Sequence, residues 1–154
     1  MAAAGFTPDA LVAELTNDPK SLGYSVLVHA EGGAQIATLA TLLNAKSGAG
    51  AEAVPSLPIQ PSALLDLVSF DEFDQLTTLQ LQQLQVRMAA GTIKIGDPAI
   101  QSWFGKLFAN AATTKQALAA KATTTGSRAE VLFGTGFVVT ENEISTATAT
   151  ILAS

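Results

Sequence analysis

The stretch Val54-Pro55-Ser56-Leu57-Pro58-Ile59-Gln60-Pro61 divides the sequence into two parts, each with helical patterns. Prolines at 55, 58 and 61 favour an extended, polyproline-like backbone and interrupt any helix. A merely flexible linker would be polar, whereas Val54, Leu57 and Ile59 give this one apolar side chains that can lie on another surface. We therefore expect an extended Pro/Gly/Ala-rich linker or arm over residues 45–61, either docked or flexible.

Short helices are predicted on both sides of this arm, because apolar residues recur at three- and four-residue steps behind capping residues. Thr7-Pro8-Asp9 begins the first helix, and Asn17-Asp18-Pro19 ends it and places Pro19 in the first turn of a second. Ser69 with Glu72 and Thr140 with Glu143 have the spacing of capping boxes. The sequence predicts a mainly α, small multi-helix domain, with an N-terminal helical lobe over 1–44 and a C-terminal helical core over 62–154.

Two short segments have strand-like patterns. Thr92-Ile93-Lys94-Ile95 alternates polar and apolar residues, and Phe137-Val138-Val139 is apolar and partly β-branched. We expect at most a minor two-stranded ribbon, in which these two segments would pair.

The composition indicates that some apolar surface meets a partner. Hydrophobic residues make up 48% of the 154 residues, charged residues only 14%, and the mean hydropathy is +0.34. This leaves little charge to cover the outside of a soluble monomer, so a homo-oligomer is expected. No uncharged stretch approaches the roughly 20 apolar residues of a membrane span. The net charge is −5 and the basic residues are spread singly, which argues against nucleic-acid binding.

Side chains that usually perform chemistry are scarce. The chain has one histidine, His29, and no cysteine. Asp71, Glu72 and Asp74 are the tightest acidic group, but acids in the first turn of a helix are explained by the helix dipole. We therefore expect no catalytic residue, no metal site and no cofactor, and we interpret the chain as a non-enzymatic protein.

Trp103, Phe104 and Phe108 form the densest aromatic group of the sequence. Their spacing places them close together on one face of a predicted helix that starts at Asp97-Pro98. They are candidates for a partner-binding patch, and the alternative is that they belong to the core.

Two segments resemble small uncharacterised virion proteins of tailed bacteriophages. The first is the Asn-Asp-Pro-x-x-x-Gly-Tyr element from Asn17 to Tyr24, followed by Leu42-Leu43-Asn44. The second is the segment from Gly126 to Gly134, which begins Gly-Ser-Arg-Ala-Glu and precedes a capped last helix. The resemblance covers the ends of the chain and implies a virion part; it implies no enzyme activity and no catalytic residue.

The expected function is accordingly a multi-copy structural component of a tailed-phage virion, either a neck or head–tail connector protein or a tail protein. It would assemble with itself and with other virion proteins after synthesis in the bacterial host cytoplasm. Capsid decoration is one alternative. Another is a cytosolic helical adaptor that binds a protein partner through Trp103, Phe104 and Phe108.

Overall fold

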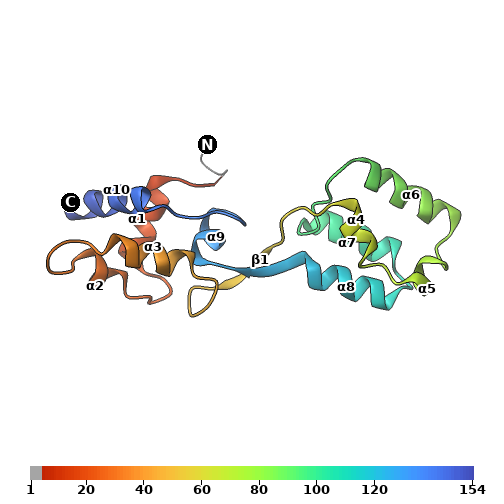
Figure 1. Ribbon diagram of the computed structural model, residues 1–154, viewed down its shortest axis with the longest axis horizontal. Helices are drawn as coiled ribbons and strands as arrows, with labels where there is room; N and C mark the ends of the chain where they lie inside the picture. The colour runs from red at the N-terminus through yellow and green to blue at the C-terminus, as the bar shows by residue number, and fades with distance from the viewer. Residues whose placement is uncertain (1–4) are drawn as a thin grey trace. The chain divides into compact units, whose positions relative to one another are not determined.

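The computed structural model describes residues 5–154 and confirms a mainly α protein built from short helices (Figure 1). Within those residues, ten helices and one antiparallel two-stranded sheet are present. The helices are α1 (Pro8–Asn17), α2 (Tyr24–Val28), α3 (Ile36–Asn44), α4 (Pro61–Leu65), α5 (Phe70–Phe73), α6 (Thr78–Ala89), α7 (Pro98–Leu107), α8 (Ala112–Ala122), α9 (Arg128–Phe133) and α10 (Glu141–Leu152). The strands are β1 (Glu52–Pro55) and β2 (Thr123–Gly126).

The chain forms two compact units, one of which is discontinuous in sequence. Unit 1 comprises the residues up to Val54 together with those from Thr125 onward, and unit 2 comprises Pro55–Thr124. This division differs from the expected one, in which residues 62–154 formed a single core. The difference arises because α9 and α10 pack on α1 and α3, whose apolar faces they cover.

The core of unit 1 joins both ends of the chain. Figure 1 shows α10 beside α1, with α3 next to both, and these helices are in contact. Leu11 and Leu39 from the first part pack with Phe133 and Ile144 from the last, and all four are buried. Burial of such side chains stabilises a fold by about 1.5–3 kcal/mol each, so the last helices are essential to this core.

Unit 2 has a separate core. Its fully buried members include Leu64 of α4, Leu84 of α6, Phe104 of α7 and Leu118 of α8, with Ile93 from the α6–α7 connection. Helices α7 and α8 pack directly against each other. Unit 2 is therefore a continuous insertion with its own apolar interior.

The observed sheet pairs different segments from those expected. β1 pairs with β2, whose residues Thr123–Thr125 are β-branched and suit a strand. The predicted pairing of 92–95 with 137–139 is wrong. Ile93 forms an isolated bridge with Ile59 instead, and the backbone N–H and C=O of Val139 bond to the side chain of Asn44.

Two predicted helix starts also differ from the structure. The second helix begins at Tyr24, because the carboxylate of Asp18 accepts hydrogen bonds from the N–H groups of Leu22, Gly23 and Tyr24 and holds 18–23 as a loop. The Thr140–Glu143 capping box is confirmed, whereas Ser69 makes no side-chain cap on α5. No helix in the described part of the chain is long and apolar enough to cross a membrane.

Candidate interaction surface

Helix α7 carries the predicted aromatic group, and its position in the sequence is fixed by its first residues. The Asp97 side chain accepts a hydrogen bond of 2.8 Å from the N–H of Ala99, and Pro98 occupies the first turn. Further along, Phe104 and Phe108 are each 1% exposed and lie in the core of unit 2. The prediction that these two side chains offer a partner-binding patch is wrong, because they fill the space between α7 and the other helices of unit 2.

Trp103, the third predicted residue, lies at the surface edge of that core. Its side chain is half-buried, and the guanidinium of Arg87 stands 5.0 Å from the centre of its ring. This is cation–π geometry, which holds both side chains in place. Beside them lies an open groove of about 480 Å³ between α6 and α7, lined by Gln82, Gln83, Val86, Arg87, Ala90 and Trp103.

The residues that line this groove are both polar and apolar, and Val86 is an exposed valine among them. Val86 is 73% exposed on α6, whose other exposed residues include Leu79 and three glutamines, Gln82, Gln83 and Gln85. Both helices that border the groove belong to unit 2 (Figure 1). The groove thus combines an aromatic ring, a fixed cation and an accessible aliphatic side chain, which is the chemistry of a protein-binding site.

The arm is docked on its own chain. Val54 is buried in β1, so close to β2 that a Cβ on Gly126 would lie 2.6 Å from its methyl carbons. Ile59 is half-buried and exchanges backbone hydrogen bonds of 2.9 and 2.8 Å with Ile93. Of the three candidate arm residues, only Leu57, at 56% exposed, is open to a partner.

Phe70 is the most exposed large apolar side chain, at 88%, and sequence reasoning missed it. It is the first residue of α5, whose ends are tied to α8 rather than capped locally. The N–H of Ser69 donates to the Thr114 hydroxyl, and Glu72 accepts from the N–H groups of Thr113 and Thr114. These bonds hold α5 against α8 while the phenyl ring of Phe70 remains in solvent.

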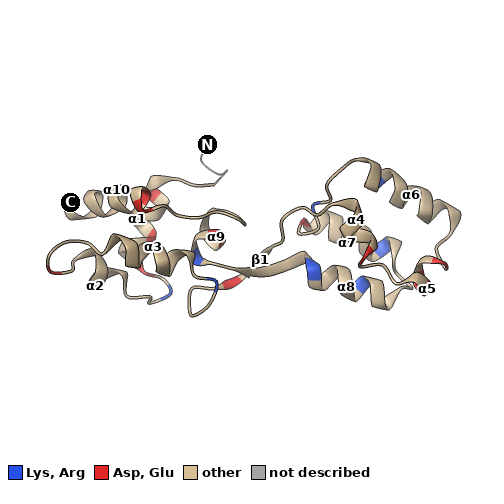
Figure 2. Ribbon diagram, in the orientation of Figure 1, with Lys and Arg blue, Asp and Glu red and all other residues tan. Residues whose placement is uncertain are grey.

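Acids and bases occupy different stretches of the sequence of unit 2 but meet in space (Figure 2). Four acids lie between the end of α4 and the end of α5, and the basic residues lie between α6 and the end of α8 together with Asp97. Glu72 of α5 accepts from the N–H of Thr114, which directly precedes Lys115. The unit holds as many acids as bases, namely Asp66, Asp71, Glu72, Asp74 and Asp97 against Arg87, Lys94, Lys106, Lys115 and Lys121. Its formal net charge is therefore zero, and unit 1 carries the −5 of the whole chain.

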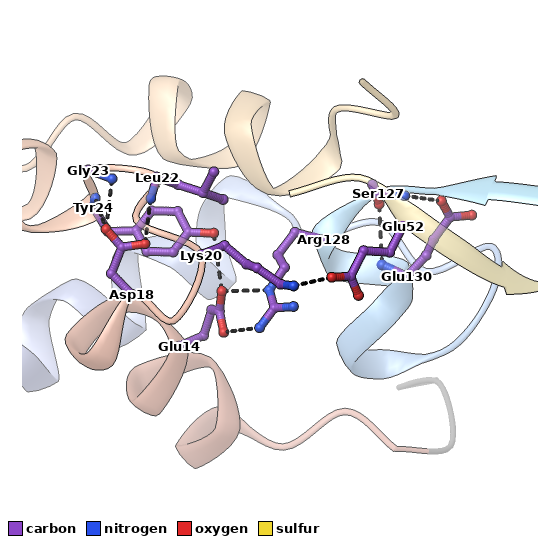
Figure 3. Close-up of polar contacts among 10 residues, drawn as sticks. All are labelled: Glu14, Asp18, Lys20, Leu22, Gly23, Tyr24, Glu52, Ser127, Arg128 and Glu130. Carbon is purple, nitrogen blue, oxygen red and sulfur yellow. Dashed lines mark hydrogen bonds and ion pairs between the residues drawn. The ribbon is translucent and has the colours of Figure 1, made fainter. Parts of the chain in front are cut away.

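A buried polar cluster in unit 1 has a structural role (Figure 3). Arg128 donates two hydrogen bonds, of 2.7 and 2.8 Å, to the two carboxylate oxygens of Glu14, and both side chains are buried. The Tyr24 hydroxyl donates to the same carboxylate at 3.3 Å. Burial, and then the adjacent Glu14 carboxylate, raise the pKa of Tyr24 well above its usual range. Both carboxylate oxygens of Glu14 and two nitrogens of the Arg128 guanidinium are engaged, so this cluster stabilises the fold.

His29 lies on the surface at the end of α2. Among residues 5–154, no group of three or more histidine, aspartate or glutamate side chains is arranged to hold a metal ion. Of the three acids expected in the first turn of a helix, Asp71 and Glu72 lie in the first turn of α5, whereas Asp74 lies at its C-terminal end, because α5 is only four residues long.

Comparisons of this chain with protein-family models, with curated proteins and with solved structures find no match.

Proposed function

We propose that the chain is a non-enzymatic structural component of a tailed-phage virion, present in many copies at the neck or in the tail. Its action is association with copies of itself and with other virion proteins. Capsid decoration is the alternative position. The sequence resemblance of its two ends provides the biological setting for this proposal.

The observation that carries the proposal is the set of exposed large apolar side chains. Members occur in both units, and each is at least 45% exposed: Val26, Leu57, Leu65, Phe70, Leu79, Val86, Val138 and Leu152. Single exposed apolar residues are ordinary, but here they accompany a charged fraction of only 14%. Subunits of closed assemblies bury surfaces of this kind against their neighbours.

Mass spectrometry of purified particles tests the proposal directly. We expect the chain in the particles at a fixed ratio to the major capsid protein: a low ratio for a neck ring, and a ratio near one for capsid decoration. Absence of the chain from washed, infectious particles, together with abundance in the lysate, would contradict a structural role.

A second candidate function is favoured by the groove beside Trp103. A groove with one aromatic ring and one fixed cation also suits a cytosolic adaptor that binds a single protein segment. Capture of the same host protein by wild type but not by a Val86→Glu variant, with none of the chain in particles, would favour the adaptor over the virion component.

A further inference from the structure

We propose that copies of this chain associate head to tail, with the Phe70 side chain of one copy seated in the groove between α6 and α7 of the next. The inference rests on the proposed function, for which it names the first partner: a second copy of the chain. Both contact sites lie within unit 2, so each copy presents them on one compact body.

The Phe70 side chain is suited to be inserted into a neighbour. It is 88% exposed, yet its backbone is anchored, since the flanking Ser69 and Glu72 bond to Thr113 and Thr114 at the start of α8. An aromatic side chain on a fixed backbone loses little conformational freedom when it binds. The free energy gained by burying this phenyl ring is therefore offset only a little by the cost of ordering it.

The groove is suited to receive such a ring. Its volume of about 480 Å³ lies within the range of pockets that enclose small ligands. The Trp103 ring and the Val86 side chain offer apolar contact, and Arg87 is already fixed over the tryptophan. Tryptophan and arginine are the residues most enriched where interfaces concentrate their binding energy.

Charge complementarity is the reason to expect a second copy of the chain in the groove. Phe70 is followed by the exposed acids Asp71 and Asp74, while the groove contains Arg87 and adjoins a second hollow in which Arg87 and Lys94 accompany a single acid, Asp97. Insertion of Phe70 brings this acidic segment to that basic edge. Complementary charge of this kind orients two surfaces and disfavours other docking positions.

The exposed apolar residues of unit 1 provide a contrast. Val26 and Val138 are also exposed, but unit 1 carries the whole net charge of −5. Contacts between two copies of unit 1 would set like charges against each other, whereas unit 2 has a formal net charge of zero.

In the proposed head-to-tail pair, one Phe70 side chain enters one groove and the second groove stays empty, so the contact is heterologous. A heterologous contact leaves one unbound Phe70 side chain and one empty groove on every pair of copies. Its repetition gives either a closed, ring-shaped assembly or an open filament. Association should therefore continue beyond a dimer.

Two variants of the full-length chain separate the halves of the contact. Phe70→Ser removes the ring and keeps the groove, and Val86→Glu places a carboxylate in the groove and keeps the ring. Both positions are largely exposed, so circular dichroism should match wild type. Each variant alone should need about 30-fold more protein to associate in analytical ultracentrifugation. Val26→Ser, at an exposed position in unit 1, is the matched control and should associate like wild type.

Mixing the two variants gives the decisive measurement. Phe70→Ser supplies an intact groove and Val86→Glu an intact ring, so the mixture should form a heterodimer that grows no further. Trp103 is the only tryptophan of the chain, and its fluorescence should change on mixing. Ala90→Glu, at another groove position, should reproduce the behaviour of Val86→Glu.

Three results would overturn the inference: a wild-type chain that stays monomeric at high concentration, single variants that still assemble, or a mixture that forms no heterodimer. None of them bears on the presence of the chain in particles. If mass spectrometry finds the chain in virions while the variants still assemble, the virion role stands and this contact is wrong.

Discussion

Glu14 and Arg128 lie 114 positions apart and form a buried ion pair with two hydrogen bonds. Removing charges from water costs free energy, and here the guanidinium donates two hydrogen bonds to the carboxylate, which also accepts from the Tyr24 hydroxyl. Such a pair adds little net stability over apolar residues of similar size. Replacement of only one of the two residues, however, leaves the other charge buried without a partner.

We predict that Arg128→Met lowers the free energy of unfolding by about 3–5 kcal/mol, because it leaves the Glu14 carboxylate buried and unpaired. The double variant Glu14→Met with Arg128→Met should recover much of that loss. The control is Lys20→Met, which removes a solvent-screened ion pair with Glu52 and should change stability far less than Arg128→Met does. Urea denaturation measures all three; equal losses for the single and double variants would contradict this account.

The free energy of unfolding should depend on pH through the Glu130 carboxylate. Burial alone would raise its pKa, but the N–H groups of Ser127 and Gly136 and the nearby Lys46 ammonium hold the pKa below its ordinary value of 4.5. The unfolded chain therefore binds the proton more tightly than the folded chain does. The stabilisation is complete above about pH 4.5 and is lost as the pH falls through the lowered pKa.

Glu130→Gln should accordingly be less stable than wild type at pH 7, and the difference should shrink as the pH is lowered below 4.5. Urea midpoints measured at a series of pH values give this comparison. Parallel curves for the two proteins would show that Glu130 does not carry the acid sensitivity.

At the scale of single elements, helix starts were predictable where the cap is local. Thr7 and Thr140 each accept a hydrogen bond from an N–H three positions later, as their sequences predicted. Ser69 and Glu72 have the same spacing, yet Glu72 caps α8 instead, 41 positions away. Local spacing contains no information about such a distant partner, and this is why the exposed Phe70 was missed.

The two-stranded sheet depends on a glycine. Gly126 of β2 faces Val54 of β1 so closely that a Cβ would lie 2.6 Å from the valine methyl carbons. We predict that Gly126→Ala lowers the free energy of unfolding by about 1–3 kcal/mol, because the strands must separate to admit the methyl group. The measurement is thermal unfolding followed by circular dichroism.

Gly105 in α7 is the matched control, since a Cβ there would meet no atom within 4 Å. Gly105→Ala should raise stability by about 0.5–1 kcal/mol through the better helix propensity of alanine. A stabilising effect of both substitutions would show that β1 and β2 pack less tightly at Gly126 than described.

For the whole molecule, the helix content and the separating arm were predictable, but the membership of the two cores was not. The Thr140–Glu143 capping box predicted a last helix, and α10 begins there. A capping box does not say which helices the buried residues of α10 will cover. Phe133 and Ile144 pack with Leu11 rather than with Phe104, and only tertiary contacts decide this. Similarly, the aromatic residues of α7 were found from the sequence, whereas their division into buried Phe104 and accessible Trp103 was not.

Separate cores predict separate responses to core mutations. Phe104→Ala should destabilise unit 2 by about 3–5 kcal/mol, since the truncated side chain leaves a cavity. Hydrogen exchange with mass spectrometry should show loss of protection across residues 55–124 and retention across 125–154. Phe133→Ala should give the reverse pattern. Equal loss in both regions for either variant would mean that the two units unfold as one.

The discontinuity of unit 1 has a consequence for synthesis on the ribosome. Leu11 and Leu39 are made early, but Phe133 and Ile144, which cover them, follow only after the whole of unit 2. At about 5–20 residues per second, translation of Pro55–Thr124 takes roughly 4–14 s. During that interval the inserted unit can already fold, while the apolar faces of α1 and α3 stay uncovered on the nascent chain. Helices α1 and α3 are thus the segments that most need chaperone protection, although they are made before unit 2.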